Sequence, residues 1–169
     1  METCNNSGWL DQKYIKFTIA AGIILILDQI TKFIILENMP LYHSIEVIPG
    51  LFNITHIHNP GGAFGFFADQ SPVIRKVVFL FMSSVAVFFV LWFHHNTPKS
   101  HPWLAFALSL IFGGAVGNLI DRFRWGNVVD FLDFYIGNSH WPAFNVADSA
   151  ISVGVTIFMI HLLFNKMPD

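Results

Sequence analysis

Charged residues are scarce in this sequence. Only 12% of its 169 residues are Asp, Glu, Lys or Arg, whereas a soluble domain contains roughly 25%. A chain with so little charge cannot cover an ordinary water-facing surface, and its 54% of hydrophobic residues excludes an intrinsically disordered protein. The formal net charge of −2 provides no basic surface for nucleic acid, so we expect no nucleic-acid partner.

Cysteine is almost absent as well. The single residue, Cys4, cannot form an internal disulfide and matches no cysteine-based metal motif. Phenylalanine, in contrast, occurs 19 times, as expected for a chain that packs against lipid. Together with a mean hydropathy of +0.56, this composition predicts an integral membrane protein.

Four long apolar runs support this class. Each contains 17 to 20 residues, enough for a helix to cross roughly 30 Å of hydrocarbon. Lipid cannot satisfy the open edges of strands, so we expect helices. The first run contains charges and is not followed by a small-residue cleavage site, so we expect it to remain as a membrane helix. The predicted fold is an all-α membrane protein, residues 1–169 forming one domain, with transmembrane helices at 17–36, 77–93, 103–120 and 147–164.

Two connections are long, and alternation of the spans places both on the same side of the membrane. In the first, residues 37–76, apolar and polar residues alternate over 44–48 and 52–58, which predicts strands. Lysine and arginine divide four against five between the two sides, so the positive-inside rule does not decide orientation. Setting aside Lys32 and Arg122 as buried functional residues favours the long connections lying outside.

Polar residues gather at the membrane face where these connections emerge. A charge at mid-membrane costs roughly 2.5–3.5 kcal/mol, so charges inside spans need a reason. Asp28 and Lys32 lie four residues apart on one helix face, where they can pair. The residues that can converge at this face are Asp28, Lys32, Asn59, Asn118, Asp121, Arg122, Asp130, Asn145 and Asp148. Their clustering predicts a site at the boundary between water and lipid.

The residue types at this face favour carboxylate chemistry. The sequence contains neither a Gly-x-Ser-x-Gly nor a His-Glu-x-x-His motif. His56 and His58 can share a strand face and hold a metal, but two histidines so spaced are more often ordinary polar residues. Two close aspartates, such as Asp130 and Asp148, share one proton, so that one acts as a base on water and the other as an acid.

Simpler interpretations remain open at this point. Asp130 can be a solvated loop residue, with Asp133 as the competing acid, and Asp148 can be a first-turn acid favoured by the helix dipole. Asn145 can be a helix N-cap, and the glycines at 113, 114 and 117 are typical of close helix packing. A small proton-coupled transporter or channel subunit using Asp28, Lys32 and Asp148 as a relay is the main rival, but the second and third spans carry no ionisable residue for a relay.

Five short segments, in order, carry a resemblance to a known family. They are Asp28-Gln29-Ile30-Thr31-Lys32, Asn59-Pro60-Gly61-Gly62-Ala63-Phe64, Gly117-Asn118-Leu119-Ile120-Asp121-Arg122, Val128-Val129-Asp130-Phe131 and Phe144-Asn145-Val146-Ala147-Asp148-Ser149. On these segments and the four-span frame, the chain resembles the lipoprotein signal peptidase family (signal peptidase II), which are bacterial membrane aspartic proteases. Pro60 and Gly62 depart from residues that the family often has at these positions.

The resemblance implies a fold, an activity and a set of site residues. It implies a small extracytoplasmic β-sheet from the first long loop, which cradles substrate, and a multi-pass protein of the bacterial inner membrane with both termini inside. The expected enzyme removes signal peptides from diacylglyceryl-modified prolipoproteins just before the lipidated cysteine, with its active site near the extracytoplasmic face.

The resemblance also implies site residues, with Asp130 and Asp148 as the expected catalytic dyad. The expected substrate-binding or site-supporting residues are Asn59, Gly61, Asn118, Asp121, Arg122, Asn145, Asp28 and Lys32. We expect no cofactor or metal, and a monomer whose partners are the prolipoprotein and the lipid bilayer.

Overall fold

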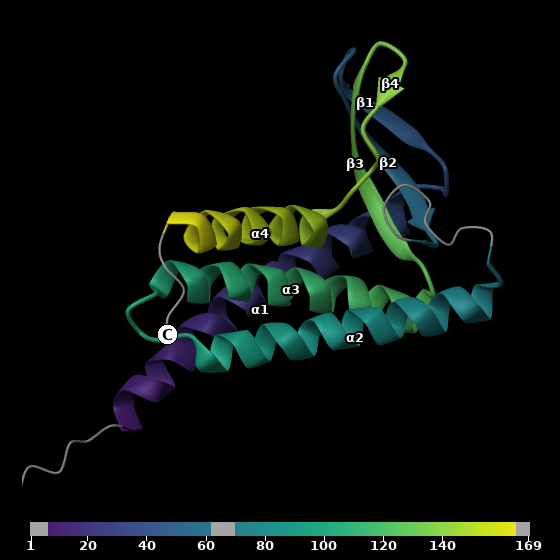
Figure 1. Cartoon of the computed structure of the whole chain (residues 1–169). Coiled ribbons are helices and arrows are strands. Elements are labelled where there is room, and N and C mark those ends of the chain that lie inside the picture. The colour runs from purple at the N-terminus through teal and green to yellow at the C-terminus, as the bar shows by residue number, and fades with distance from the viewer. Residues whose placement is uncertain (1–6, 62–69, 165–169) are drawn as a thin grey trace, which may run out of the picture.

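Long helices form a bundle, and a small sheet stands at one end of it (Figure 1). This computed structural model describes residues 7–61 and 70–164. The elements are, in chain order, α1 (Ser7–Asn38), β1 (Ser44–Ile48), β2 (Phe52–Asn59), α2 (Pro72–Asn96), α3 (Pro102–Trp125), β3 (Val128–Ile136), β4 (Ser139–His140) and α4 (Val146–Phe164).

All four helices in the described part of the chain are long and apolar enough to cross a membrane. This confirms the expected fold class, but the helices continue past the apolar runs. The third run ends at Ile120, whereas α3 continues to Trp125 and stops at Gly126, whose left-handed φ of 77° caps it. Asp121 and Arg122, placed by the sequence at the start of a connection, are therefore helical residues.

The third helix is the centre of the bundle. Half of its apolar window is buried, compared with 17–22% in the other three helices, and it packs against each of them. Glycines permit this close approach, as the sequence indicated. A Cβ on Gly117 would lie 2.5 Å from Oδ2 of Asp28 in α1, and one on Gly113 would lie 2.7 Å from the backbone oxygen of Ala21. The phenylalanine-rich α2 is largely exposed, which suits contact with lipid.

The sheet has the strand order β1-β2-β3-β4, with antiparallel neighbours. Its first two strands come from the first long connection, as expected. The second long connection supplies β3 and β4, which the sequence did not predict. In the β2–β3 pair, Ile57 lies opposite Asp130 and Asn59 lies opposite Val128.

A hydrophobic cluster attaches the sheet to the bundle. Ile35 and Met39 at the end of α1 pack with Val129 and Phe131 of β3, and all four are buried. Val129 and Phe131 flank Asp130 in the sequence, so the contact fixes the position of that carboxylate relative to the helices.

Candidate active site

A buried ion cluster joins α1 to α3 at the sheet end of the bundle. The Lys32 ammonium lies 2.9 Å from Oδ2 of Asp28 and 2.8 Å from Oδ2 of Asp121, and it donates to Oδ1 of Asn118 at 2.9 Å. These contacts use all three N–H bonds of the ammonium group. Both carboxylates are fully buried. A buried charge is tolerated only when it is paired and hydrogen-bonded, and that requirement is met here.

The two carboxylates of this cluster also bind the other elements of the site. Oδ1 of Asp28 accepts the backbone N–H of Ala147 in the first turn of α4, at 2.9 Å. Oδ2 of Asp121 accepts the backbone N–H of Val129 in β3, at 3.3 Å. Gln29 bridges both carboxylates, donating to Asp28 at 3.2 Å and to Asp121 at 3.1 Å. The cluster therefore sets the relative positions of three helices and the strand that carries Asp130.

Two asparagines connect this framework to the remaining aspartates. Asn145 is fully buried; its Nδ2 donates to Oδ1 of Asp130 at 2.7 Å, and its Oδ1 accepts the backbone N–H of Asp148 at 2.9 Å. The second bond is the N-cap of α4 that the sequence suggested. Asn118 accepts from Lys32 and donates to Oδ1 of Asp148 at 2.8 Å. A continuous chain of hydrogen bonds thus joins the ion cluster to both aspartates.

Asp130 occupies an environment that favours its protonated form. Its side chain is almost fully buried, and Oδ2 accepts from Nδ2 of Asn59 at 3.0 Å. Burial raises the pKa of Asp130 to about 7, and the nearby charge of Asp148 acts in the same direction. The amide donors of Asn59 and Asn145 oppose this rise in pKa. Near neutral pH, Asp130 can therefore hold or release a proton.

Both aspartates line one open cavity of about 820 Å³ between the sheet and the bundle. Gly61 lines it too, and its backbone N–H donates to Oδ1 of Asn59 at 3.1 Å. Arg122 reaches the cavity from α3, where its charge attracts Asp148 and Asp130, and its guanidinium lies 5.3 Å from the ring centre of Phe79. The cavity wall thus contains two carboxylates, one guanidinium and the amide groups of Asn59 and Asn118.

Asp133, the competing acid, points into a different environment. Its Oδ2 accepts from Asn53 at 2.9 Å, and its Oδ1 lies 2.8 Å from Nδ1 of His140. It does not line the cavity that contains Asp130 and Asp148.

The histidine pair is satisfied by protein contacts. His56 is buried, with Nδ1 2.8 Å from the backbone oxygen of Met39 and Nε2 3.1 Å from Nε2 of His58. Throughout residues 7–61 and 70–164, no group of three or more His, Cys, Asp or Glu side chains is placed to hold a metal ion.

The structure brings all ten sequence-predicted site residues to the same end of the bundle. Gly62, Ala63 and Phe64, the end of the second motif, lie outside the described residues. Sequence reasoning missed Gln29 as a contributor, although a polar residue next to Asp28 in an apolar span was a detectable signal. It also missed Trp141 in the cavity wall, for which the sequence offered only its aromatic character, and Phe144, although Phe144 opens the fifth motif.

Comparison with known proteins identifies the family of this chain. Residues 20–164 match the family model described as signal peptidase (SPase) II. The chain is 56% identical to the lipoprotein signal peptidase of Desulforapulum autotrophicum, over 92% of this chain and 96% of that one. It is 45% identical to that of Syntrophus aciditrophicus, over 88% and 92%. A solved structure described as a bacterial membrane enzyme, obtained by the in meso method, superposes with a TM-score of 0.80 at 35% identity, covering 91% of this chain and 93% of that one. Family model, relatives and fold agree over most of the length, and the chain belongs to the signal peptidase II family.

Proposed function

We propose that Asp130 and Asp148 are the catalytic dyad with which this member of the signal peptidase II family removes signal peptides from prolipoproteins. The protein is an aspartic endopeptidase and a multi-pass bacterial membrane protein. The observation that carries the dyad assignment is the shared cavity. Both carboxylates line it, Asn145 bonds the carboxylate of Asp130 and the backbone N–H of Asp148, and the charge of Asp148 raises the pKa of Asp130.

The reaction needs one proton distributed between two carboxylates. The ionised aspartate removes a proton from a water molecule, whose oxygen attacks the scissile carbonyl carbon. The protonated aspartate donates its proton to the carbonyl oxygen, giving a neutral tetrahedral intermediate. The aspartate that took the proton from water then passes it to the amide nitrogen, while the other aspartate takes a proton back from a hydroxyl of the intermediate. The C–N bond breaks, and the pair again holds one proton. With a pKa of about 7, Asp130 is suited to hold the shared proton.

The surrounding amides and the guanidinium have positioning roles in this proposal. Asn118 and Asn145 each hold one of the aspartates, and both are buried. Asn59 holds the opposite oxygen of Asp130 and is fixed in turn by Gly61. Arg122 lies where it can orient the substrate backbone or stabilise negative charge as it develops.

The location of the cavity suits a lipid-modified substrate. Each CH₂ group withdrawn from the bilayer costs about 0.8 kcal/mol, so a diacylglyceryl cysteine stays in the membrane. The scissile bond just before that cysteine must therefore be cut at the membrane boundary, where the polar ends of α1, α3 and α4 meet the sheet (Figure 1).

We further propose that this end faces the extracytoplasmic side of the inner membrane, that both termini are cytoplasmic, and that residues 1–169 act as a single-domain monomer. With Lys32 and Arg122 set aside as residues of the site, Lys13, Lys16 and Lys99 at the opposite end support this orientation through the positive-inside rule. Reporter fusions to the C-terminus that are active only in the cytoplasm test the orientation.

Matched substitutions test the dyad. We expect Asp130→Asn and Asp148→Asn each to lower cleavage of a diacylglyceryl lipopeptide precursor by at least roughly 10³-fold, because an amide can neither accept nor supply the shared proton. Asp133→Asn, on the same strand, is the control and is expected to stay within a few-fold of wild type. The assay follows the released signal peptide by mass spectrometry, with thermal unfolding in detergent to confirm folding. Retained turnover in either dyad variant, or an equal loss in Asp133→Asn, would refute the assignment.

A further inference from the structure

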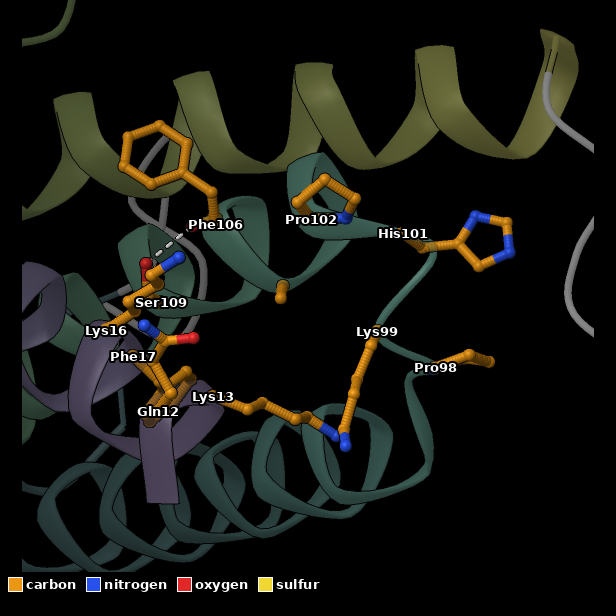
Figure 2. A pocket seen from close by; sticks show the side chains of 11 residues that line it. Gln12, Lys13, Lys16, Phe17, Pro98, Lys99, His101, Pro102, Phe106 and Ser109 are labelled. Atoms are coloured by element: carbon orange, nitrogen blue, oxygen red, sulfur yellow. Dashed lines mark hydrogen bonds between the residues drawn. The ribbon is translucent and has the colours of Figure 1, made fainter. Parts of the chain in front are cut away.

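A second cavity lies at the end of the bundle opposite the aspartates. It has a volume of about 260 Å³ and is formed by the start of α1, the connection between α2 and α3, and the first two turns of α3 (Figure 2). Its wall contains Lys13, Lys16 and Lys99, and no acidic residue is among the described residues that line it.

Two lysines of this cavity, Lys13 and Lys99, are held close together although they come from distant parts of the sequence. Lys13 donates to the backbone oxygens of His95 at 3.0 Å and Thr97 at 2.7 Å, which fastens the α2–α3 connection to α1. Lys99, in that connection, is near enough for its charge to repel that of Lys13, and Figure 2 shows the two side chains reaching toward each other. Lys16 is exposed at the other side of the cavity. The fold thus places three lysines along the wall of one cavity.

The remainder of the wall is largely apolar. Phe17 is buried, Phe106 is 42% exposed, and Pro98, Pro102 and Ala105 complete this surface. Ser109 is buried and donates to the backbone oxygen of Phe106 at 2.6 Å, so its hydroxyl is already occupied. A small soluble anion would leave the apolar part of the wall uncovered. An anion attached to a hydrocarbon chain would cover both parts.

The cavity also lies at the depth where lipid head groups are found. It is located where the first membrane span begins and where the second and third spans are connected. Trp103, 68% exposed, and Trp92, 51% exposed, lie near the same end of the bundle, as is typical of aromatic residues at a membrane interface.

We propose that this cavity is a binding site for an anionic phospholipid, with the phosphate between Lys13, Lys16 and Lys99 and the first carbons of an acyl chain against Phe17 and Phe106. Basic residues at a membrane surface attract anionic lipid, each by an amount that changes affinity severalfold. The inference does not depend on the proposed dyad, because the two sites lie at opposite ends of the bundle.

The test compares lipids on the purified protein in a neutral detergent. Native mass spectrometry measures binding of dioctanoyl-phosphatidylglycerol, dioctanoyl-phosphatidylcholine and inorganic phosphate. We expect the wild type to prefer phosphatidylglycerol over phosphatidylcholine. The double substitution Lys16→Gln and Lys99→Gln should reduce that preference by about 30-fold, while Lys13 is left to hold the connection.

Three further measurements make the result interpretable. K16R/K99R keeps both charges and should keep the preference, and the matched control R75Q/K76Q removes two charges at the other membrane boundary and should keep it as well. Cleavage activity of K16Q/K99Q confirms folding, and the single variant K16Q replaces it if that activity is lost. The proposed site is refuted if K16Q/K99Q prefers phosphatidylglycerol over phosphatidylcholine as strongly as the wild type does. It is also refuted if R75Q/K76Q loses this preference to the same extent as K16Q/K99Q. Binding of inorganic phosphate as tight as that of phosphatidylglycerol overturns its assignment to a lipid.

Discussion

The pKa of Asp130 predicts how cleavage depends on pH. At a pKa of about 7, the dyad holds its shared proton below neutral pH and loses it above. The fraction of enzyme that keeps this proton falls tenfold for each pH unit above 7, so kcat/KM at pH 9 should be about 100-fold below its plateau. The assay is kcat/KM for a diacylglyceryl lipopeptide in detergent between pH 6 and pH 9, because this parameter reports ionisation of the free enzyme.

The fall of kcat/KM above pH 7 is the alkaline limb of the pH profile. Removal of one hydrogen bond to Asp130 should move this alkaline limb to higher pH. Asn59 donates to Oδ2 of Asp130 and lowers its pKa. In Asn59→Ala the carboxylate loses that stabilisation, the pKa of Asp130 rises, and the limb should move upward by about one pH unit. Asn53→Ala is the matched control. It removes an equivalent amide donor from Asp133 on the same pair of strands and should leave the limb in place.

Two results would refute this reasoning. A kcat/KM that stays constant or rises between pH 7 and pH 9 would mean that the dyad does not need the proton assigned to Asp130. A limb that moves downward in Asn59→Ala would mean that the asparagine acts on another group. A lower plateau in Asn59→Ala is compatible with the reasoning, because its amide also lines the cavity.

Two other predictions concern stability, measured by unfolding in detergent. Lys32→Met leaves the buried carboxylates of Asp28 and Asp121 unpaired and should lower the free energy of unfolding by about 3–5 kcal/mol; an unchanged unfolding midpoint would contradict the role given to the ion cluster. Gly117→Ala places a methyl group against Asp28 and should destabilise the bundle by about 1–3 kcal/mol. Gly22→Ala is its control, since nothing lies within 4 Å of the added Cβ, and it should be neutral or stabilising by up to about 1 kcal/mol; equal effects at both positions would contradict the close-packing argument.

The sequence was informative about the membrane spans because a helix in lipid needs a long apolar run. It was less informative about where the helices end. Asp121 and Arg122 lie beyond the apolar run, and their helical conformation depends on a partner in α1 and on Gly126, contacts that no local pattern reveals. The strand β3 was missed for a related reason. Its first four residues, Val128 to Phe131, are all buried, so the alternation that reveals a half-exposed strand is absent.

The site residues that the sequence revealed most clearly are those whose burial in a membrane span costs the most free energy. Charges such as Asp28 and Lys32 are conspicuous in an apolar span, whereas the neutral Gln29, which binds two carboxylates, gives a weaker signal. The lysine cavity was not predicted, because two whole spans and a long connection separate Lys13 from Lys99 in the sequence, and each resembles an ordinary lysine near the end of a helix.

The ion cluster also sets a time order for maturation of the protein. Translation proceeds at roughly 5–20 residues per second, so α1 enters the bilayer on the order of ten seconds before Ala147 is made. During that interval Asp28 has Lys32 as a neighbour in its own helix, but the backbone N–H of Ala147, which donates to its Oδ1, has not yet been synthesised. Asn145 and Asp148 are synthesised at the same late stage. With the proposed dyad, a growing polypeptide therefore lacks one of its two aspartates, and it becomes a protease only when its last helix docks.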